Sequence, residues 1–235
     1  MRERTQYPEW LQAYRHVYRI EMNLGKRLES VYALVPEGAV LVDVGSDHGY
    51  LPAKLVKDGK IKRSAVTDIN VGPLESAKKT AIRFEVFEKM TFFLADGLDG
   101  VDYDYDTVTI CGMGGILIAD IIARAERCRE CTLILQPMRH QEYLRKYLWD
   151  NGYMIEKEVY SVEHGKPYVV LVTRYTGEKI EYSEEDTYIG FERDTNEDRK
   201  QYNEKLVRSL RKKLLGVGEK EKEILETVCE RLSRI

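Results

Sequence analysis

The chain has 235 residues, of which 43% are apolar and 33% charged, and its formal net charge is −3. This length and apolar content allow one sizeable core with an appendage, and the slightly negative charge excludes the global basicity of a nonspecific nucleic-acid binder, so a polyanion must meet local basic patches. Because residues 1–5 lack an apolar signal core and no segment approaches the ~20 apolar residues of a membrane span, we expect a cytoplasmic protein without a membrane partner.

Two segments precede the main pattern. Residues 1–22 are polar and aromatic with helix-like spacing, and we expect them to form an N-terminal extension with a short helix. In residues 23–34, apolar side chains recur at helical spacing and stop before Pro36, which predicts another helix.

From residue 40 onward, short apolar strands alternate with helices. Strands are predicted over residues 40–44, 64–68, 91–94, 107–111 and 132–136, and helices over 50–58, 73–87, 116–127 and 141–151. This alternation predicts a parallel sheet with right-handed crossovers. Residues 153–161 and 168–175 are also strand-like, and the segment between them is too short for a crossover helix, which predicts an antiparallel hairpin.

The composition changes after Gly177. Charged and amide residues dominate 183–215, and two narrow apolar stripes separated by Gly216-Val217-Gly218 predict two helices folded into an antiparallel pair. The stripes consist of Leu206, Leu210 and Leu214, and then of Ile224, Leu225, Val228 and Leu232. A solvated tail accounts for most of the charges, but the two apolar stripes require a partner surface.

The segment Val40–Leu51 is typical of the first strand–loop–helix unit of a nucleotide-type binding fold. A pyrophosphate-binding loop presents glycines and a helix N-terminus to the phosphates. Here Asp47 stands where the middle glycine of G-x-G-x-x-G would be. A carboxylate at this position repels a pyrophosphate but not a ligand that carries an ammonium and a sulfonium, so the loop favours S-adenosylmethionine over NAD.

Three further strand ends carry candidate ligand contacts. Asp68, 23 residues after Gly45, is spaced to hydrogen-bond ribose hydroxyls, with helix capping as the alternative. Asp96-Gly97 forms either an acceptor for an adenine amino group or an ordinary turn. The glycines of residues 112–115 indicate either close approach of a ligand or a tight turn into the next helix.

The loop Gln136–His140, after the fifth strand, also has two interpretations. Gln136 offers donors and an acceptor for a base edge, while Arg139 and His140 offer contacts to phosphates. Alternatively, Pro137 shapes the turn and the basic residues are solvated.

Metal, redox and nucleophilic chemistry have little support. Cys128 and Cys131 form a single C-x-x-C that precedes a strand, which favours a reduced structural pair over a zinc or redox site. The histidines are too scattered for a metal site, and no Ser/His/Asp or Cys/His set is visible.

Local basic clusters are either solvated faces or a track for a phosphate backbone. They are Lys54, Lys57, Lys60, Lys62 and Arg63; Lys78, Lys79 and Arg83; Arg139, Arg145 and Lys146; and Arg208, Arg211, Lys212 and Lys213.

Several motifs together resemble the bacterial TrmK family of tRNA (adenine-N1)-methyltransferases, which act on adenine 22. They are L-V-D-V-G-S-D-H-G-Y-L-P (41–52), T-D-I-N-V-G-P (67–73), A-D-G-L (95–98), I-C-G-M-G-G (110–115), L-Q-P (135–137) and E-H-G-K-P-Y-V-V-L (163–171). The resemblance implies an α/β fold: a Rossmann-like, seven-stranded class I methyltransferase sheet with an antiparallel final hairpin, followed by a coiled-coil-like helical domain. It divides the chain into the extension 1–22, an S-adenosylmethionine-dependent methyltransferase domain 23–177, and a helical hairpin domain 178–235 that grips tRNA.

The motifs and the resemblance together predict the site residues, and we expect a monomeric enzyme without a metal. The expected cofactor-binding residues are Asp43, Gly45, Ser46, Asp47, His48, Gly49, Asp68, Ile69, Asp96, Gly97, Gly112, Met113 and Gly114. The expected substrate-binding residues are Gln136, Pro137, Arg139 and Tyr168.

The implied reaction demands little of the side chains. Adenine N1 already carries a lone pair, so the main requirement is a near-linear arrangement of N1, the methyl carbon and the sulfur. Positive charge develops on the purine, and a nearby carboxylate would stabilise it and accept a proton from the exocyclic amine. Asp47, beside His48, is the candidate for this catalytic role, with cofactor binding as the alternative. The adenine must leave any base pair first, and Tyr50 or Tyr168 could stack on it.

Three other functions compete with this hypothesis. They are methyl transfer to another RNA, a protein or a small molecule; hydride transfer by an NAD-dependent oxidoreductase; and RNA binding by a module that retains only a nucleotide pocket.

Overall fold

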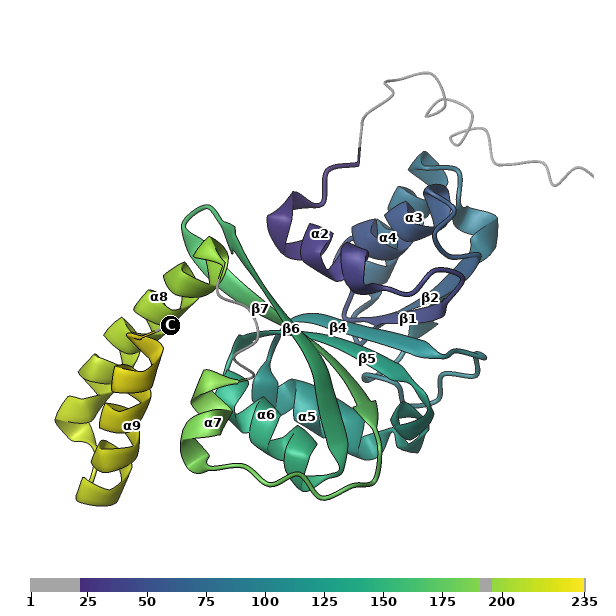
Figure 1. The fold of residues 1–235 in the computed structure, drawn as a ribbon. Helices are drawn as coiled ribbons and strands as arrows, with labels where there is room; N and C mark the ends of the chain where they lie inside the picture. Colours follow the sequence, from purple (N-terminus) through teal and green to yellow (C-terminus); the bar gives the residue numbers. More distant parts are fainter. Residues whose placement is uncertain (1–21, 191–195, 235) are drawn as a thin grey trace, which may run out of the picture.

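The computed structural model describes residues 22–190 and 196–234. Its centre is a seven-stranded sheet with the strand order β3-β2-β1-β4-β5-β7-β6 (Figure 1). The strands are β1 (Val40–Val44), β2 (Arg63–Asp68), β3 (Met90–Leu94), β4 (Thr107–Gly114), β5 (Thr132–Arg139), β6 (Tyr153–Glu163) and β7 (Lys166–Tyr175). The strands β1 to β5 pair in parallel, and β7 is antiparallel to both β5 and β6. The predicted parallel sheet closed by an antiparallel hairpin is therefore confirmed.

Helices cover both faces of the sheet (Figure 1). One face carries α2 (Gly25–Leu34), α3 (Tyr50–Lys57) and α4 (Val71–Arg83), and the other carries α5 (Gly115–Arg124) and α6 (Gln141–Asp150). Successive strand residues point to opposite faces. Leu41 therefore packs in the core under α2, α3 and α4, and Val42 packs in the core under α5 and α6. This two-sided burial explains why the central strands are continuous apolar runs.

Two predicted helices end earlier than expected, and short 3₁₀ turns follow them. The helix predicted to reach residue 87 ends at Arg83, because Glu85 adopts a left-handed conformation with φ of 61° that a helix cannot contain. The turn η1 (Phe87–Lys89) follows. Likewise, the helix predicted to reach residue 127 ends at Arg124, and η2 (Glu126–Glu130) leads into β5.

Strands β4 and β5 run further than the sequence predicted. Most of the expected glycine loop belongs to β4, and Pro137 lies inside β5. The pairing between the two strands shifts register at Met113, which faces Pro137 across the irregularity. A bulge tolerates a proline, which has no N–H to donate, and it redirects the strand ends.

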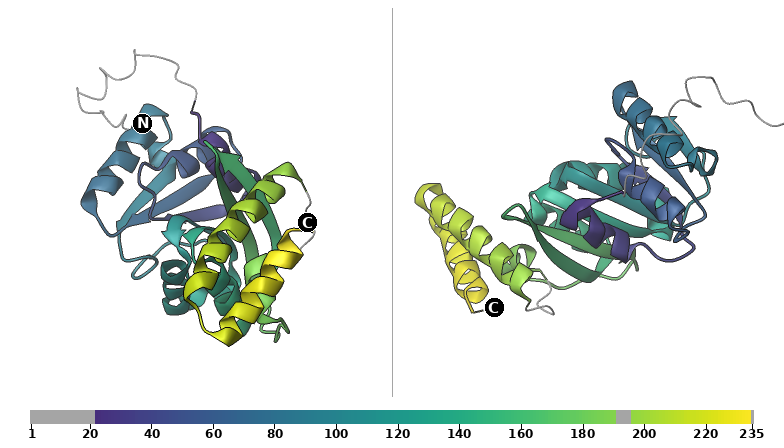
Figure 2. Two further views of the ribbon diagram at one scale, coloured as in Figure 1. Left: turned by 90° about the vertical axis from the view of Figure 1, so that its left-hand side faces the viewer. Right: turned by 90° about the horizontal axis from the view of Figure 1, so that it is seen from above.

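Where the sequence predicted two C-terminal helices, residues 178–190 and 196–234 contain three α-helices: α7 (Glu184–Ile189), α8 (Glu197–Lys213) and α9 (Glu219–Leu232). Ser183 and Asp186 form a capping box that starts α7, a sequence signal that the stripe analysis missed. Helices α8 and α9 lie side by side and project away from the sheet (Figure 2). The two predicted stripes meet in a small core between them, together with Ile189 of α7.

A buried ionic cluster joins this helical part to the sheet. Arg145 of α6 donates from Nε to Oε1 of Glu158 on β6 at 2.7 Å, and Arg199 of α8 lies 3.7 Å from the other carboxylate oxygen. Arg199 also donates to the Ile189 carbonyl at 2.5 Å. Arg145 was predicted to belong to a surface basic cluster. That prediction is wrong, because its side chain is fully buried and neutralised by Glu158.

Within residues 22–190 and 196–234, no helix has the length and apolarity needed to cross a bilayer. The helix expected in the N-terminal extension falls in residues 1–21, outside the described part of the chain.

Candidate functional site

A cavity of about 380 Å³ opens at the carboxyl ends of β1 and β4. Strand order reverses between these two strands, and ligands of open α/β sheets bind at such a reversal. The residues that line it are Arg27, Leu28, Asp43, Val44, Gly45, Ser46, Asp47, His48, Gly49, Tyr50, Leu51, Cys111 and Gly112. The fold therefore brings the whole predicted loop 45–49 together with Asp43 and Gly112 in one place.

Asp43 is the most strongly perturbed acid of the cavity. Its side chain is 4% exposed and accepts a hydrogen bond from Thr109 Oγ1 at 2.6 Å. Burial raises the pKa of Asp43 to about 6, although hydrogen bonds from Ser46 and Thr109 and the charge of Arg27 act in the opposite direction. A ligand that brings positive charge into the cavity would stabilise this carboxylate.

Asp47 and His48 lie at the more open part of the cavity. The Asp47 side chain is 80% exposed, and its Oδ2 lies 3.5 Å from His48 Nε2. The His48 ring lies 5.6 Å from the ring of Tyr50, at the start of α3. The loop thus presents a carboxylate and two rings toward a ligand.

The glycines of the loop have packing reasons. Gly45 has a φ of 68°, and a Cβ there would overlap the methyl group of Met113, which lies against the loop. Gly49 has a φ of 64°, and a Cβ there would lie 2.9 Å from the Cβ of Ala77 on α4. The positive φ favours glycine at both positions, and at Gly49 the backbone and Cβ of Ala77 also leave no room for a side chain.

The predicted contacts after β2 and β3 lie on neighbouring loops of the same sheet edge, outside this cavity. Asp68 Oδ1 accepts from the Asn70 backbone N–H at 2.8 Å just before α4, and the Ile69 side chain is exposed. Asp96 is paired with Arg124 at 3.2 Å. A Cβ on Gly97 would lie 3.0 Å from Ile121, so packing against α5 accounts for this glycine.

Arg27 is a site residue that the sequence analysis missed. It lies on α2, and its Nη1 donates to Gln136 Oε1 at 2.7 Å. The same oxygen accepts from the backbone N–H of Gly112 at 3.2 Å. Position 27 is three residues after Leu24 and one before Leu28, on the buried stripe of the helix. A basic residue within an otherwise apolar stripe was the sequence signal that could have identified Arg27 as a site residue.

Gln136 is fully buried behind the glycine segment of β4. Its Nε2 donates to the Pro137 carbonyl at 3.2 Å, so both ends of the amide already have protein partners. In this arrangement Gln136 supports Gly112, and contact with a base would require Gln136 to give up these bonds.

The remaining predicted substrate contacts lie around the end of β5. Tyr168 of β7 lies under the Arg27 guanidinium, 5.9 Å from ring centroid to Cζ. Arg139 is exposed, and its Nε lies 3.6 Å from where a Cβ on Gly114 would be. Pro137 is buried in the strand.

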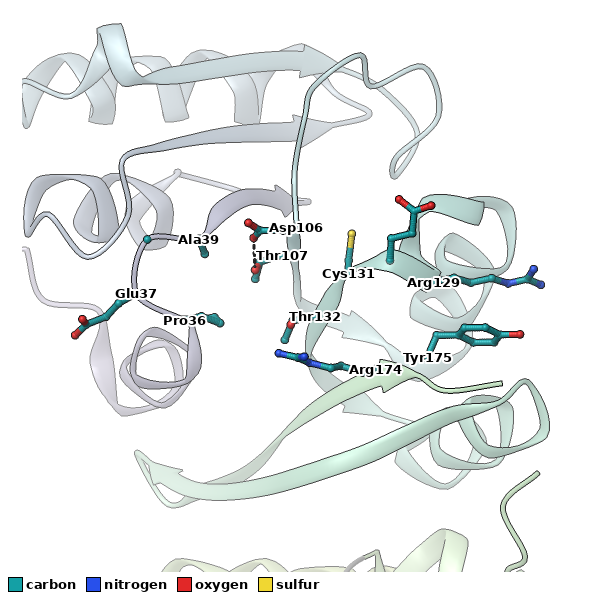
Figure 3. Close-up of a pocket in the computed structure, with 12 residues that line it drawn as sticks. Pro36, Glu37, Ala39, Asp106, Thr107, Arg129, Cys131, Thr132, Arg174 and Tyr175 are labelled. Atoms are coloured by element: carbon teal, nitrogen blue, oxygen red, sulfur yellow. Dashed lines mark hydrogen bonds between the residues drawn. The ribbon is translucent and has the colours of Figure 1, made fainter. Parts of the chain in front are cut away.

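A second cavity, of about 470 Å³, lies at the opposite edge of the sheet (Figure 3). Its lining includes Asp106, Thr107, Thr132 and Arg174, near the starts of β1, β4 and β5. It contains none of the predicted site residues, and the amino edge of a parallel sheet is not where α/β folds bind ligands.

The two neighbouring cysteines are structural in character. Cys128 and Cys131 are buried and reduced, and Cys131 Sγ lies 3.3 Å from the Arg127 carbonyl. Burial raises the pKa of Cys128 to about 12 and that of Cys131 to about 11, so both thiols stay protonated near neutral pH.

A family model described as "Methyltransferase domain" matches residues 24–171. The tRNA (adenine(22)-N(1))-methyltransferase of Bacillus subtilis is 37% identical over 155 residues, which is 65% of this chain and 65% of that protein. The aligned region thus spans just under two thirds of the relative's length.

Solved structures extend the similarity over nearly the whole chain. Sp1610 of Streptococcus pneumoniae, a presumed tRNA (m1A22) methyltransferase that has also been solved with S-adenosyl-L-methionine, is 32% identical. It has a TM-score of 0.79, over 90% of this chain and 99% of that one. The B. subtilis m1A22 tRNA methyltransferase TrmK is 27% identical, with a TM-score of 0.66 over 91% and 97% of the two chains.

Proposed function

The chain belongs to the TrmK family of methyltransferases, and we propose that it transfers a methyl group from S-adenosylmethionine to N1 of an adenine in tRNA, at position 22 by analogy with its relatives. The observation that carries the proposal is the pair of carboxylates, Asp43 and Asp47, in the lining of the cavity at the switch point of the sheet, where Arg27 is the one basic side chain with a fixed charge among the described lining residues. A tRNA substrate implies action in the cytoplasm, and we propose a monomer.

The residues of the cavity fit a cationic methyl donor. S-Adenosylmethionine, when bound, supplies an electrophilic methyl group on a positively charged sulfur. Asp43 is a buried carboxylate whose ionised form lacks a full counter-charge, so a cation in the cavity would lower its pKa. We propose that Asp68 and Asp96, on the neighbouring loops, contact the nucleoside part of the donor, where Asp96 would share its carboxylate with Arg124.

Asp47 is the candidate group for the charge that develops on the adenine. Its carboxylate is largely solvated in the free protein, so its field at the cavity is screened by water. An adenine placed over the cavity would exclude that water and strengthen the attraction between Asp47 and the methylated ring. The same carboxylate could accept the proton that the exocyclic amine loses. His48, 3.5 Å away, would orient Asp47.

The α8–α9 hairpin provides a surface for the rest of the tRNA. A groove of about 540 Å³ between its helices is lined by Lys200, Arg208 and Arg211 from α8 and by Arg234 after α9. These cations lie on an arm that projects beyond the sheet (Figure 2), where they could contact phosphates far from the target base. We propose that this groove performs the gripping role expected of residues 178–235.

Incubation with unmodified tRNA and S-adenosylmethionine, followed by mass spectrometry of the nucleosides, tests the proposal. The expected product is 1-methyladenosine, and replacement of A22 by G in the transcript should abolish it. Methylation of another atom, or only of a protein or small molecule, would contradict the proposed substrate. Thermal stabilisation by NAD but not by S-adenosylmethionine would contradict the proposed reaction.

A further inference from the structure

A third cavity, of about 340 Å³, lies between the start of α3 and α4, beside the proposed methyl-transfer site. It shares His48 and Tyr50 with the cavity that the loop 45–49 lines, so the two cavities adjoin at these side chains. Its other walls include Lys79, Thr80 and Arg83 of α4. We propose that this cavity binds a nucleotide next to the target adenine in the RNA, an inference that rests on the proposed function.

The lining matches the two parts of a nucleotide. The rings of His48 and Tyr50 lie 5.6 Å apart at one side, and Tyr50 is partly exposed, so it presents a face on which a base can stack. Lys79 and Arg83 are exposed at the other side, where they can contact the phosphate. Ser76, also in the lining, adds a hydroxyl for the ribose.

The charge of this region favours a phosphate. The nearby Lys78 is paired with Glu75 at 2.7 Å, whereas Lys79 has no ion-pair partner within the described chain. Arg83 and Lys57 lie 5.5 and 4.8 Å from the centroid of the Phe84 ring, so Lys57 adds a third positive charge near Arg83. Asp47, the nearest acid of the catalytic loop, lines the first cavity and not this one.

The location also suits the geometry of the reaction. An adenine turned out of its pair brings the flanking backbone to the mouth of the catalytic cavity. A neighbouring base held by Tyr50 would keep that backbone open and fix the direction from which N1 approaches. The contact would therefore strengthen tRNA binding and leave the affinity for S-adenosylmethionine unchanged.

The test compares the double substitution Lys79→Ala/Arg83→Ala with Lys62→Ala/Lys89→Ala. The control removes the same charge from exposed lysines just before β2 and β3, at the opposite edge of the sheet. The first variant should raise KM for tRNA about tenfold and reduce the salt dependence of tRNA binding by roughly 0.7–0.9 per lost phosphate contact. Its Kd for S-adenosylhomocysteine should equal that of wild type, and Lys79→Arg should retain the wild-type KM.

Equal KM values for the two double variants would overturn the inference while leaving the methyltransferase proposal intact. If the wild-type protein methylates no tRNA, the proposed function is wrong, but the nucleotide site can still be tested. Fluorescence anisotropy with labelled tRNA then measures whether the cavity binds RNA. In that case, equal Kd values for the two double variants would also reject the nucleotide site.

Discussion

Arg27 and Gln136 lie 109 residues apart in the chain, yet the Arg27 guanidinium donates to the side-chain amide oxygen Oε1 of Gln136 at 2.7 Å. The backbone N–H of Gly112 donates to the same side-chain oxygen, so the amide group of Gln136 links α2 to the ends of β4 and β5. Arg27 and Gly112, the two groups that Gln136 holds, line the cavity together with the loop 45–49. This part of the lining depends on a helix that precedes the first strand.

Replacing Arg27 by Met should therefore weaken the binding of S-adenosylmethionine. A charge-assisted hydrogen bond contributes about 1.5–3 kcal/mol, which is the most that its loss can take from binding, so Kd should rise by up to about a hundredfold. Isothermal titration calorimetry measures this directly. The Kd of Arg27→Lys should fall between those of wild type and Arg27→Met, because lysine keeps the charge but not the planar guanidinium group. The neighbouring exposed position supplies a control, and Lys26→Met should leave Kd unchanged.

Asp47→Asn should reduce turnover more than it reduces cofactor affinity. The substitution preserves shape and removes the charge that would stabilise the methylated adenine, a term of the kind that contributes about 2–4 kcal/mol at catalytic sites. Single-turnover methylation of tRNA and the Kd for S-adenosylhomocysteine separate the two effects. Full turnover together with an unchanged Kd would show that neither the catalytic nor the binding role applies.

The stability of the free protein should depend on pH through Asp43. The pKa of Asp43 is raised from 3.8 to about 6, so the folded state binds this proton more tightly than the unfolded state does. The proton contributes up to about 3 kcal/mol to the free energy of unfolding. This contribution is complete below about pH 4 and is lost as the pH rises through 6. Urea unfolding between pH 4 and 8 should show this loss, and Asp43→Asn should remove it.

Cofactor binding should show the opposite dependence on pH. A cationic ligand favours ionised Asp43, so the affinity for S-adenosylmethionine should increase between pH 5 and 7 with release of a proton. Thr109→Val removes a hydrogen bond that lowers the pKa of Asp43 and should shift this transition to higher pH. An affinity that is flat across this range in both proteins would contradict the assignment.

Glu158→Gln should strongly destabilise the fold. Glu158 is the shared counter-charge of Arg145 and Arg199, both fully buried, and removing one partner of a buried pair costs about 3–5 kcal/mol. The matched control is Glu156→Gln on the same strand, where the pair with Arg174 is exposed and contributes less than about 1 kcal/mol. Urea unfolding followed by circular dichroism distinguishes them. Equal effects would show that the buried cluster does not anchor α8.

The periodicity of the chain was sufficient to predict the sheet, its final hairpin and most of the helices. Short apolar runs separated by amphipathic segments can bury both faces of a sheet only as a parallel α/β structure, and the six-residue connection before residue 168 permits only a hairpin. The loop around Asp47 was also evident, because the identity of one residue at a strand end decides which charge a ligand can carry. These are local properties of the sequence, so they can be predicted without knowing which distant residues contact one another.

Contacts between distant segments were decided only by the tertiary structure. In the sequence, Arg27, Arg145 and Lys79 are three similar cations on helices. In the structure, Arg27 bonds to Gln136 beside the proposed cofactor cavity, Arg145 is buried against Glu158, and Lys79 lines an open cavity beside Tyr50. Gln136, which its loop position presented as a reader of bases, is buried with both ends of its amide paired. Local sequence determines which elements form, but the partner of a charge depends on how those elements pack, and that packing places residues more than a hundred positions apart within hydrogen-bonding distance.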